Sequence, residues 1–191
     1  ADNHMIILGV GVLLFVALHG VAAVPRLKVC WKAQSGERLY GPTFGIASLI
    51  ALAVIVLGWQ SSDFVGIYEP QPWGWYANYL LTFFAFLCLG IFLFRGHLRQ
   101  KLRFPMAIAT IFWAAGHLFA NGDLAGLILF GGLLFGSLAH ILVAASNNIH
   151  PSPEVRIGHA GLSLIFGSAL YVIMTQWHLL RSGVPIFVLS N

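Results

Sequence analysis

The chain has 191 residues, of which 59% are hydrophobic and only 8% are charged, and its mean hydropathy is +0.85. Soluble domains carry roughly 25% charged residues, so this composition excludes a protein with an ordinary water-facing surface. The length allows about six membrane spans of about 20 residues each, joined by short connections. The net charge of +4 does not indicate a nucleic-acid partner, because the basic residues are concentrated in short loops between apolar runs.

Apolar runs bounded by charged residues, proline or glycine predict membrane helices over residues 5–24, 43–59, 76–94, 105–119, 124–146 and 159–179. The expected fold class is therefore all-α, a polytopic transmembrane bundle of about six helices. We expect one domain over residues 5–191. Residues 1–4 precede the Met5 that opens the first apolar run, and we expect them to be left over from an expression tag.

Lys and Arg are distributed unevenly among the predicted loops. The loops after the first, third and fifth helices hold nine of the ten basic residues: Arg26, Lys28, Lys32, Arg38, Arg95, Arg99, Lys101, Arg103 and Arg156. With six spans these loops share one side of the membrane, which the positive-inside rule assigns to the cytoplasm. Arg181 is predicted on the outer side with Asp63, Glu69 and Asp123, so both termini are expected to face outward.

Two local patterns concern the fourth and fifth predicted helices. Asn121, Gly122 and Asp123 form a turn between them, and Asp123 is expected to cap the fifth helix by accepting hydrogen bonds from its free backbone N–H groups. Gly132 and Gly136 repeat a small residue at four-residue spacing. This spacing lets another helix, or a flat ligand, approach the backbone closely.

Four histidines are predicted inside the apolar helices: His19, His117, His140 and His178. Ionisable groups within a bilayer cost free energy and usually mark function. The sequence has no intramembrane carboxylate pair, Ser/His/Asp grouping, phosphate-binding loop or HExxH motif, which disfavours hydrolytic chemistry. Imidazoles among Gly, Phe and Trp instead suit haem, and without a CxxCH motif the haem would be bound non-covalently, as haem b. The alternative is that each histidine hydrogen-bonds a neighbouring helix and stabilises the bundle.

The segment RFPMAIATIFWAAGHLFANGDLAGLILFGG, residues 103–132, resembles the central signature of the NnrU family of bacterial membrane proteins. That signature reads RHPM, then a Trp, then AHLLANGDLASLLLFGG. The segments LFVALHG around His19, GERLYGPTFGIASLIALAVIVLGW and WHLLRSGVPIF resemble the first, second and closing motifs of the family. Phe104 stands where the family has His, which argues against the methyl-transfer chemistry of isoprenylcysteine methyltransferases, more distant relatives that share this element.

The resemblance implies a protein of the bacterial inner membrane associated with nitrite and nitric oxide metabolism in denitrifiers. NnrU proteins are also similar to the plastid 15-cis-zeta-carotene isomerase, a haem b membrane enzyme whose two haem-linked histidines lie in LHSG and AHTLW motifs. These motifs fall on His19 and His117, which implies that these two bind haem b, with Trp113, Gly116 and Asn121 shaping the pocket.

Three functions stay open at this point. The first is a haem protein with a redox or gas-responsive role, which needs a redox partner. The second is a membrane isomerase that acts on a lipid-soluble polyene. The third is a non-catalytic partner that assembles or regulates a nitrogen-oxide reductase. Only the second is an enzyme in its own right, so the sequence leaves the question of catalysis undecided.

Depth along the predicted helices complicates the pair of haem ligands that the resemblance implies. At a rise of 1.5 Å per residue, His19 lies about 20 Å from the outer end of the first helix, and His117 lies about 5 Å from the outer end of the fourth. A haem held by both would need a tilted or shortened helix. Depth alone favours His19 with His140 toward the cytoplasm and His117 with His178 toward the outside.

Overall fold

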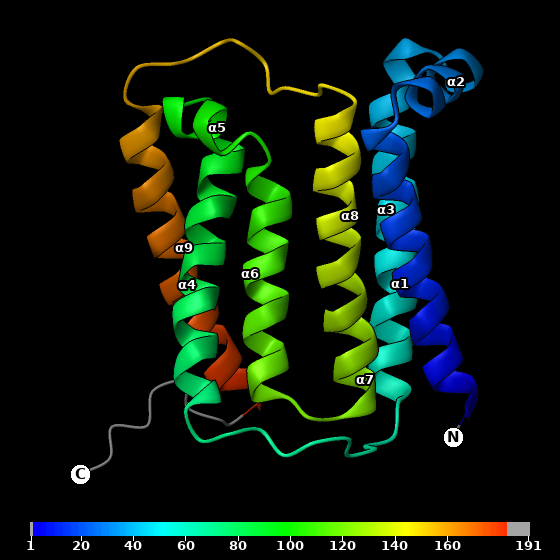
Figure 1. Ribbon diagram of the computed structural model, residues 1–191, viewed down its shortest axis with the longest axis vertical. Coiled ribbons are helices and arrows are strands. Elements are labelled where there is room, and N and C mark those ends of the chain that lie inside the picture. The colour runs from blue at the N-terminus through cyan, green and yellow to red at the C-terminus, as the bar shows by residue number, and fades with distance from the viewer. Residues whose placement is uncertain (1, 183–191) are drawn as a thin grey trace.

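The computed structural model describes residues 2–182, and Figure 1 shows a bundle of long helices that run side by side. The long elements are α1 (Asp2–Ala23), α3 (Glu37–Ser61), α4 (Gly74–Leu93), α6 (Pro105–Ala120), α8 (Gly132–Ser146) and α9 (His159–Ser182). The short α7 (Leu124–Gly126) and the π-helix η1 (Leu127–Gly131) lead directly into α8. The predicted all-α fold class is confirmed.

Five of these segments are long and apolar enough to cross a membrane: Asn3–Ala23, Glu37–Ser61, Gly74–Leu93, Leu124–Ser146 and His159–His178. The remaining apolar helix, Pro105–Ala120, has 16 residues and is shorter than an average span. Large apolar side chains lie exposed on the outside of the bundle, with Leu13 and Phe135 each 71% exposed. Exposing large apolar side chains to water costs free energy, whereas contact with the hydrocarbon of a bilayer does not. The chain is a multi-pass membrane protein in contact with lipid.

The basic loops are more ordered than the sequence predicts. Two short helices, α2 (Pro25–Ser35) and α5 (His97–Leu102), occupy segments predicted as connections, and α3 begins six residues before the predicted boundary at residue 43. Pro25 fits the first turn of α2, where a missing N–H costs nothing. Trp31 then holds α2 against α3, because its Nε1 donates to Oγ1 of Thr43 at 3.2 Å and its ring packs on Tyr40. These contacts between neighbouring helices are invisible to a pattern of hydropathy.

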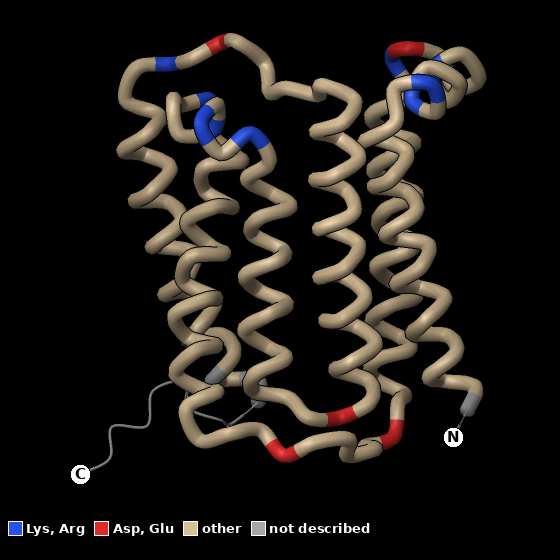
Figure 2. Tube along the Cα trace, viewed as in Figure 1, with Lys and Arg blue, Asp and Glu red and all other residues tan. Residues whose placement is uncertain are grey.

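Charge separates between the two ends of the bundle, as Figure 2 shows. The nine loop Lys and Arg residues gather at one end, the basic end, where Lys32 pairs with Glu37 at 3.1 Å and Arg95 with Glu154 at 2.5 Å. The opposite end is called the outer end after its predicted orientation. It has acidic residues in its loops, with Asp63 and Glu69 between α3 and α4 and Asp123 between α6 and α7. The side chain of Arg181 lies outside the described residues. The predicted segregation is confirmed, and the assignment of the basic end to the cytoplasm stays a prediction.

Native Cys30 offers a direct test of that orientation. It is exposed on α2 at the basic end, whereas Cys88 is buried in α4. In a Cys88→Ala background we expect a membrane-impermeant maleimide to leave Cys30 unlabelled in intact cells and to label it after lysis. The matched control is Glu69→Cys in a chain without Cys30, because Glu69 is exposed at the outer end and should react in intact cells. Labelling of Cys30 in intact cells would reverse the predicted topology.

Glycines set the closest contacts between helices. A Cβ on Gly132 or Gly136 of α8 would lie 2.5 Å from a methyl group of Val12 or Val16, so both glycines face α1. The sequence predicts that another helix or a flat ligand approaches these two glycines closely. In the structure it is the helix α1 that does so. The six long helices form a row of neighbours in the order α3, α1, α8, α6, α4, α9. The row is bent so that α3 and α4 line a common cavity, described below.

Candidate functional site

Three of the four membrane histidines make the same kind of hydrogen bond. Nδ1 of His19 donates to the carbonyl of Phe15 at 2.8 Å, and Nδ1 of His117 donates to the carbonyl of Trp113 at 2.8 Å. Nδ1 of His140 donates to the carbonyl of His19 at 3.1 Å. Because a carbonyl oxygen only accepts, each neutral ring has its hydrogen on Nδ1 and its lone pair on Nε2. This is the arrangement that orients metal-binding imidazoles in proteins.

The histidines lie in two groups at different depths. His19 and His140 are neighbours toward the basic end, joined by the hydrogen bond between α8 and α1. His117 lies one turn before Asn121 at the outer end, and it lines the same two cavities as His178. The structure therefore brings together the pairs that depth favours and does not bring His19 next to His117. The hydrogen bond from His140 to His19 also fits the alternative drawn from the sequence, in which histidines hydrogen-bond neighbouring helices and stabilise the bundle.

A cavity of about 610 Å³ lies between α3 on one side and α4 and α6 on the other. Its volume falls within the roughly 300–1,000 Å³ typical of small-molecule and cofactor sites. Its wall is mostly apolar and includes Phe15, Ile55, Val56, Trp59, Phe86, Leu89, Ala109, Trp113, Leu129, Phe130 and Leu133. Gln60, Thr110, His117, Asn121 and His178 add polar groups. None of the described residues in this wall is Asp, Glu, Lys or Arg, so the cavity suits a large and mainly apolar ligand.

The ring of His117 is held on two sides by aromatic side chains. Phe130 stacks on it with ring centroids 4.6 Å apart and planes at 26°, and Trp113 lies at 4.8 Å. Phe130 is only 4% exposed and belongs to η1, where an i to i+5 hydrogen-bonding pattern shifts the side chains around the helix axis. Sequence reasoning missed Phe130, because nothing in the residues 127–131 distinguishes a π-helical turn from an α-helical one.

The three predicted pocket residues have different positions. Trp113 lines the cavity, and so does Asn121, whose Nδ2 donates to the carbonyl of His117 at 2.9 Å. Gly116 instead lies where α6 meets α4, since a Cβ there would be 2.7 Å from Oδ1 of Asn78. Gly116 therefore supports the site indirectly, by letting the helix that holds His117 approach α4.

The model of the family described as NnrU protein matches residues 7–186, nearly the whole chain. The chain belongs to the NnrU family. No curated protein and no solved structure matches it. The closing segment WHLLRSGVPIF, residues 177–187, extends beyond residue 182, so its last five residues lie outside the described part of the chain.

In this NnrU protein, the turn between α6 and α7 anchors the outer loop of residues 62–73. The carbonyl of Gly122 accepts hydrogen bonds from the backbone N–H groups of Ile67 at 2.7 Å and Tyr68 at 3.0 Å. A Cβ on Gly122 would collide with the carbonyl of Tyr68, which explains a glycine at this position. Asp123 accepts a hydrogen bond from the backbone of Gly126 at 2.9 Å, so the predicted helix cap is confirmed.

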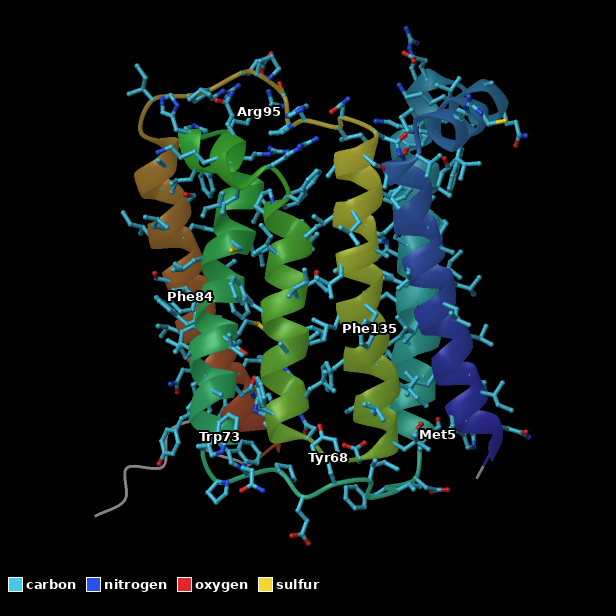
Figure 3. All side chains as sticks on the ribbon, in the orientation of Figure 1. Met5, Tyr68, Trp73, Phe84, Arg95 and Phe135 are labelled. Atoms are coloured by element: carbon cyan, nitrogen blue, oxygen red, sulfur yellow. The ribbon has the colours of Figure 1, made fainter. Side chains whose placement is uncertain are left out.

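Tyr68 extends the same anchor to the end of α6, and Figure 3 shows it at the outer end, near Trp73 and opposite to Arg95. Its hydroxyl donates to the carbonyl of Asn121 at 2.6 Å and also contacts the carbonyl of Leu118. Burial, and after it the carboxylate of Asp123, raise the pKa of Tyr68 above its ordinary value. A tyrosine hydroxyl is protonated at neutral pH even at its ordinary pKa, so Tyr68 can donate the hydrogen bond that holds the loop against the turn that follows His117.

Proposed function

We propose that this NnrU protein binds haem b in the 610 Å³ cavity, where Nε2 of His117 would hold the iron. The observation that supports it best is the orientation of the His117 ring by the Trp113 carbonyl and the Phe130 face. His178 lines the same cavity and is the candidate for the second ligand. We favour His117 with His178 over His19 with His117. His19 lies near the end of α1 that is at the basic end of the bundle, far in depth from His117, and it does not line the cavity.

The residues of the cavity fit the chemistry of haem b. The porphyrin body is flat and apolar, and the wall supplies aromatic and aliphatic side chains from α3, α4, α6 and η1. Gln60 and Asn121 lie at the outer end of the wall, where their amide N–H groups can donate hydrogen bonds to carboxylates. The cavity thus offers an imidazole, an apolar slot and neutral donors.

A haem b with two histidine ligands supplies one-electron transfer, and one that loses a ligand offers an iron able to bind a small gas. The chain itself holds the His117 proton on Nδ1, packs Phe130 against Trp59 in the cavity wall, and positions the helix end through Asn121. We therefore propose a redox or gas-responsive role in nitrite and nitric oxide metabolism at the bacterial inner membrane. A redox partner or a nitrogen-oxide reductase would complete that role.

A second function has one observation in its favour. Leu52 and Val56 on α3 and Met106 on α6 are apolar, line the cavity and are exposed, so the cavity is open between these helices. A lipid-soluble molecule could therefore enter from the bilayer, which suits an isomerase acting on a polyene. Conversion of a cis-polyene by protein in lipid vesicles, measured by chromatography of the extracted isomers, would favour this function over the redox role.

The absorption spectrum of the purified protein tests the main proposal. After expression with haem supplied, we expect a Soret band and, on reduction, the split α and β bands of six-coordinate low-spin haem b. Titration of the purified chain with hemin should saturate at a fixed ratio to protein. A folded but colourless protein that takes up no hemin would overturn the proposal and favour the non-catalytic assembly role.

A further inference from the structure

The cationic side chains at the basic end form two groups, and Figure 2 shows the group around α2 set apart from the group around α5. Near α5, Arg95 pairs with Glu154, and Nε of Arg103 donates to the carbonyl of Ile149 at 2.8 Å. Residues 25–40 offer a single carboxylate, that of Glu37, to four cations: Arg26, Lys28, Lys32 and Arg38. The group around α2 therefore carries positive charge that the chain around it does not balance.

Two of these cations, Lys28 and Lys32, converge on one aromatic ring. They are four residues apart on α2, so they lie on the same side of the helix with Cβ atoms about 5–6 Å apart. Nζ of Lys28 lies 6.0 Å from the centre of the Tyr40 ring, and Nζ of Lys32 lies 5.8 Å from it. Glu37 accepts from Lys32 at 3.1 Å, whereas no described carboxylate pairs with Lys28. An anion between the two ammonium groups would offset their repulsion.

Aromatic packing fixes the position of the two lysines. The centre of the Trp31 ring lies 6.0 Å from the centres of both the Tyr40 and the Phe44 rings, so α2, which carries the lysines, is packed against α3. The Tyr40 hydroxyl makes no hydrogen bond with the described residues, and it is a donor next to the two ammonium groups. The positive-inside rule explains cations at this end of the bundle, but it does not require two of them and a free donor to share one ring.

Apolar side chains lie beside the cationic group and continue from it along α3. Leu27 and Val29 are exposed on α2, which has no buried residue. Ile46 and Ile50 are exposed one turn apart on α3, about 9 and 15 Å from Tyr40 toward the middle of the bundle. Figure 1 shows α2 at the end of α1 and α3, at the edge of the bundle, so lipid beside these helices reaches it. A ligand here would meet cations at one end and apolar side chains along its length.

We propose that this surface binds an anionic phospholipid. The ammonium groups of Lys28 and Lys32 and the hydroxyl of Tyr40 donate to the oxygens of its phosphate, and the flexible lysine stems let both ammonium groups reach one phosphate. The acyl chains lie along α3, past Ile46 and Ile50. A zwitterionic headgroup carries a cation of its own, which the unbalanced positive charge around α2 would repel. The proposal does not rest on haem binding, because it concerns the basic end, away from the proposed iron ligand.

Titration of the purified full chain with dioleoylphosphatidylglycerol, followed by native mass spectrometry, measures the affinity. A lysine near anionic lipid contributes about fivefold to binding, which corresponds to about 1 kcal/mol. We therefore expect the double variant Lys28→Gln and Lys32→Gln to raise the Kd about 25-fold. The double variant Lys28→Arg and Lys32→Arg keeps both charges and should bind like the native chain. A photoactivatable phosphatidylglycerol should give adducts within residues 27–50, located by mass spectrometry of peptides.

The matched control removes the same number of charges on the other side of the basic end. Lys101 on α5 and Arg156 before α9 are exposed, and the double variant Lys101→Gln and Arg156→Gln should keep the Kd of the native chain. If the double glutamine variant on α2 does not fold, Lys28→Gln alone decides, with an expected rise in Kd of about fivefold. Equal losses in both double glutamine variants, equally tight binding of phosphatidylcholine, or displacement of the lipid by excess inorganic phosphate would each overturn the anionic-phospholipid site.

Discussion

Replacing His117 by alanine is expected to abolish the haem b spectrum of this NnrU protein. The substitution removes Nε2, the proposed iron ligand, and it also removes the ring on which Phe130 stacks at 4.6 Å. A cavity without an imidazole at this position keeps its apolar walls but loses the group that would hold the iron. The measurement is the reduced-minus-oxidised spectrum of purified variant, normalised to protein, with folded state checked by size-exclusion chromatography.

The other histidine variants make this prediction specific. His178→Ala should convert the six-coordinate spectrum to a five-coordinate one, because His178 lines the same cavity. His19→Ala and His140→Ala should leave the spectrum unchanged, and so should His97→Ala, which lies in α5 at the basic end. Loss of haem in both His19→Ala and His140→Ala, with His117→Ala unaffected, would move the cofactor to the basic end. Loss in His19→Ala and His117→Ala alone would support the pair that the family resemblance implies.

Gly136→Leu is expected to cause a large loss of folded protein. A Cβ at this position would lie 2.5 and 2.8 Å from the two methyl groups of Val16, and three further carbons would follow it. Membrane helices associate chiefly through close packing, so α8 and α1 would have to separate. We expect a cost at the upper end of the about 1–3 kcal/mol typical of overpacking, seen as a lower folded yield in fluorescence-detected chromatography.

Gly9→Leu is the matched control for this variant. Gly9 lies on α1, and a Cβ there would meet nothing within 4 Å, so leucine at this position should point into lipid and leave the yield intact. Leu133→Ala should also lose less folded protein than Gly136→Leu, because Leu133 already borders the cavity and its removal only enlarges that space. Equal yields of Gly136→Leu and Gly9→Leu would contradict the α1–α8 packing described above.

Much of the fold was predictable because membrane helices are specified by local composition. The long apolar runs, the basic loops between them and the Asp123 cap depend on residues close in sequence, and the structure agrees with each. The predicted helix limits differ most from the structure at α2, which was predicted as a connection, and at the start of α3. There a polar helix is stabilised by Trp31 packing on its neighbour, and hydropathy does not report such a contact.

The composition of the candidate site was also predictable, whereas its assembly was not. That histidines inside a bilayer need partners follows from the cost of burying them, and Trp113, His117 and Asn121 do lie in one cavity wall. Which histidines meet depends on the depth and order of the helices. Because α6 and α9 both pack on α4, His117 and His178 line the same cavities, and the packing of α8 against α1 puts His140 beside His19.

The sequence by itself determined that this is a multi-pass helical membrane protein with segregated charge and polar histidines in apolar helices. Only the tertiary structure decided the π-helical placement of Phe130, the contact of Gly116 with α4 and the two cavities that share His117. The physical reason is the range of the interactions. Helix formation and membrane insertion respond to neighbours within a few turns, whereas pairing between helices depends on close contacts among residues up to about 120 positions apart, as in the 121-residue separation of His19 and His140.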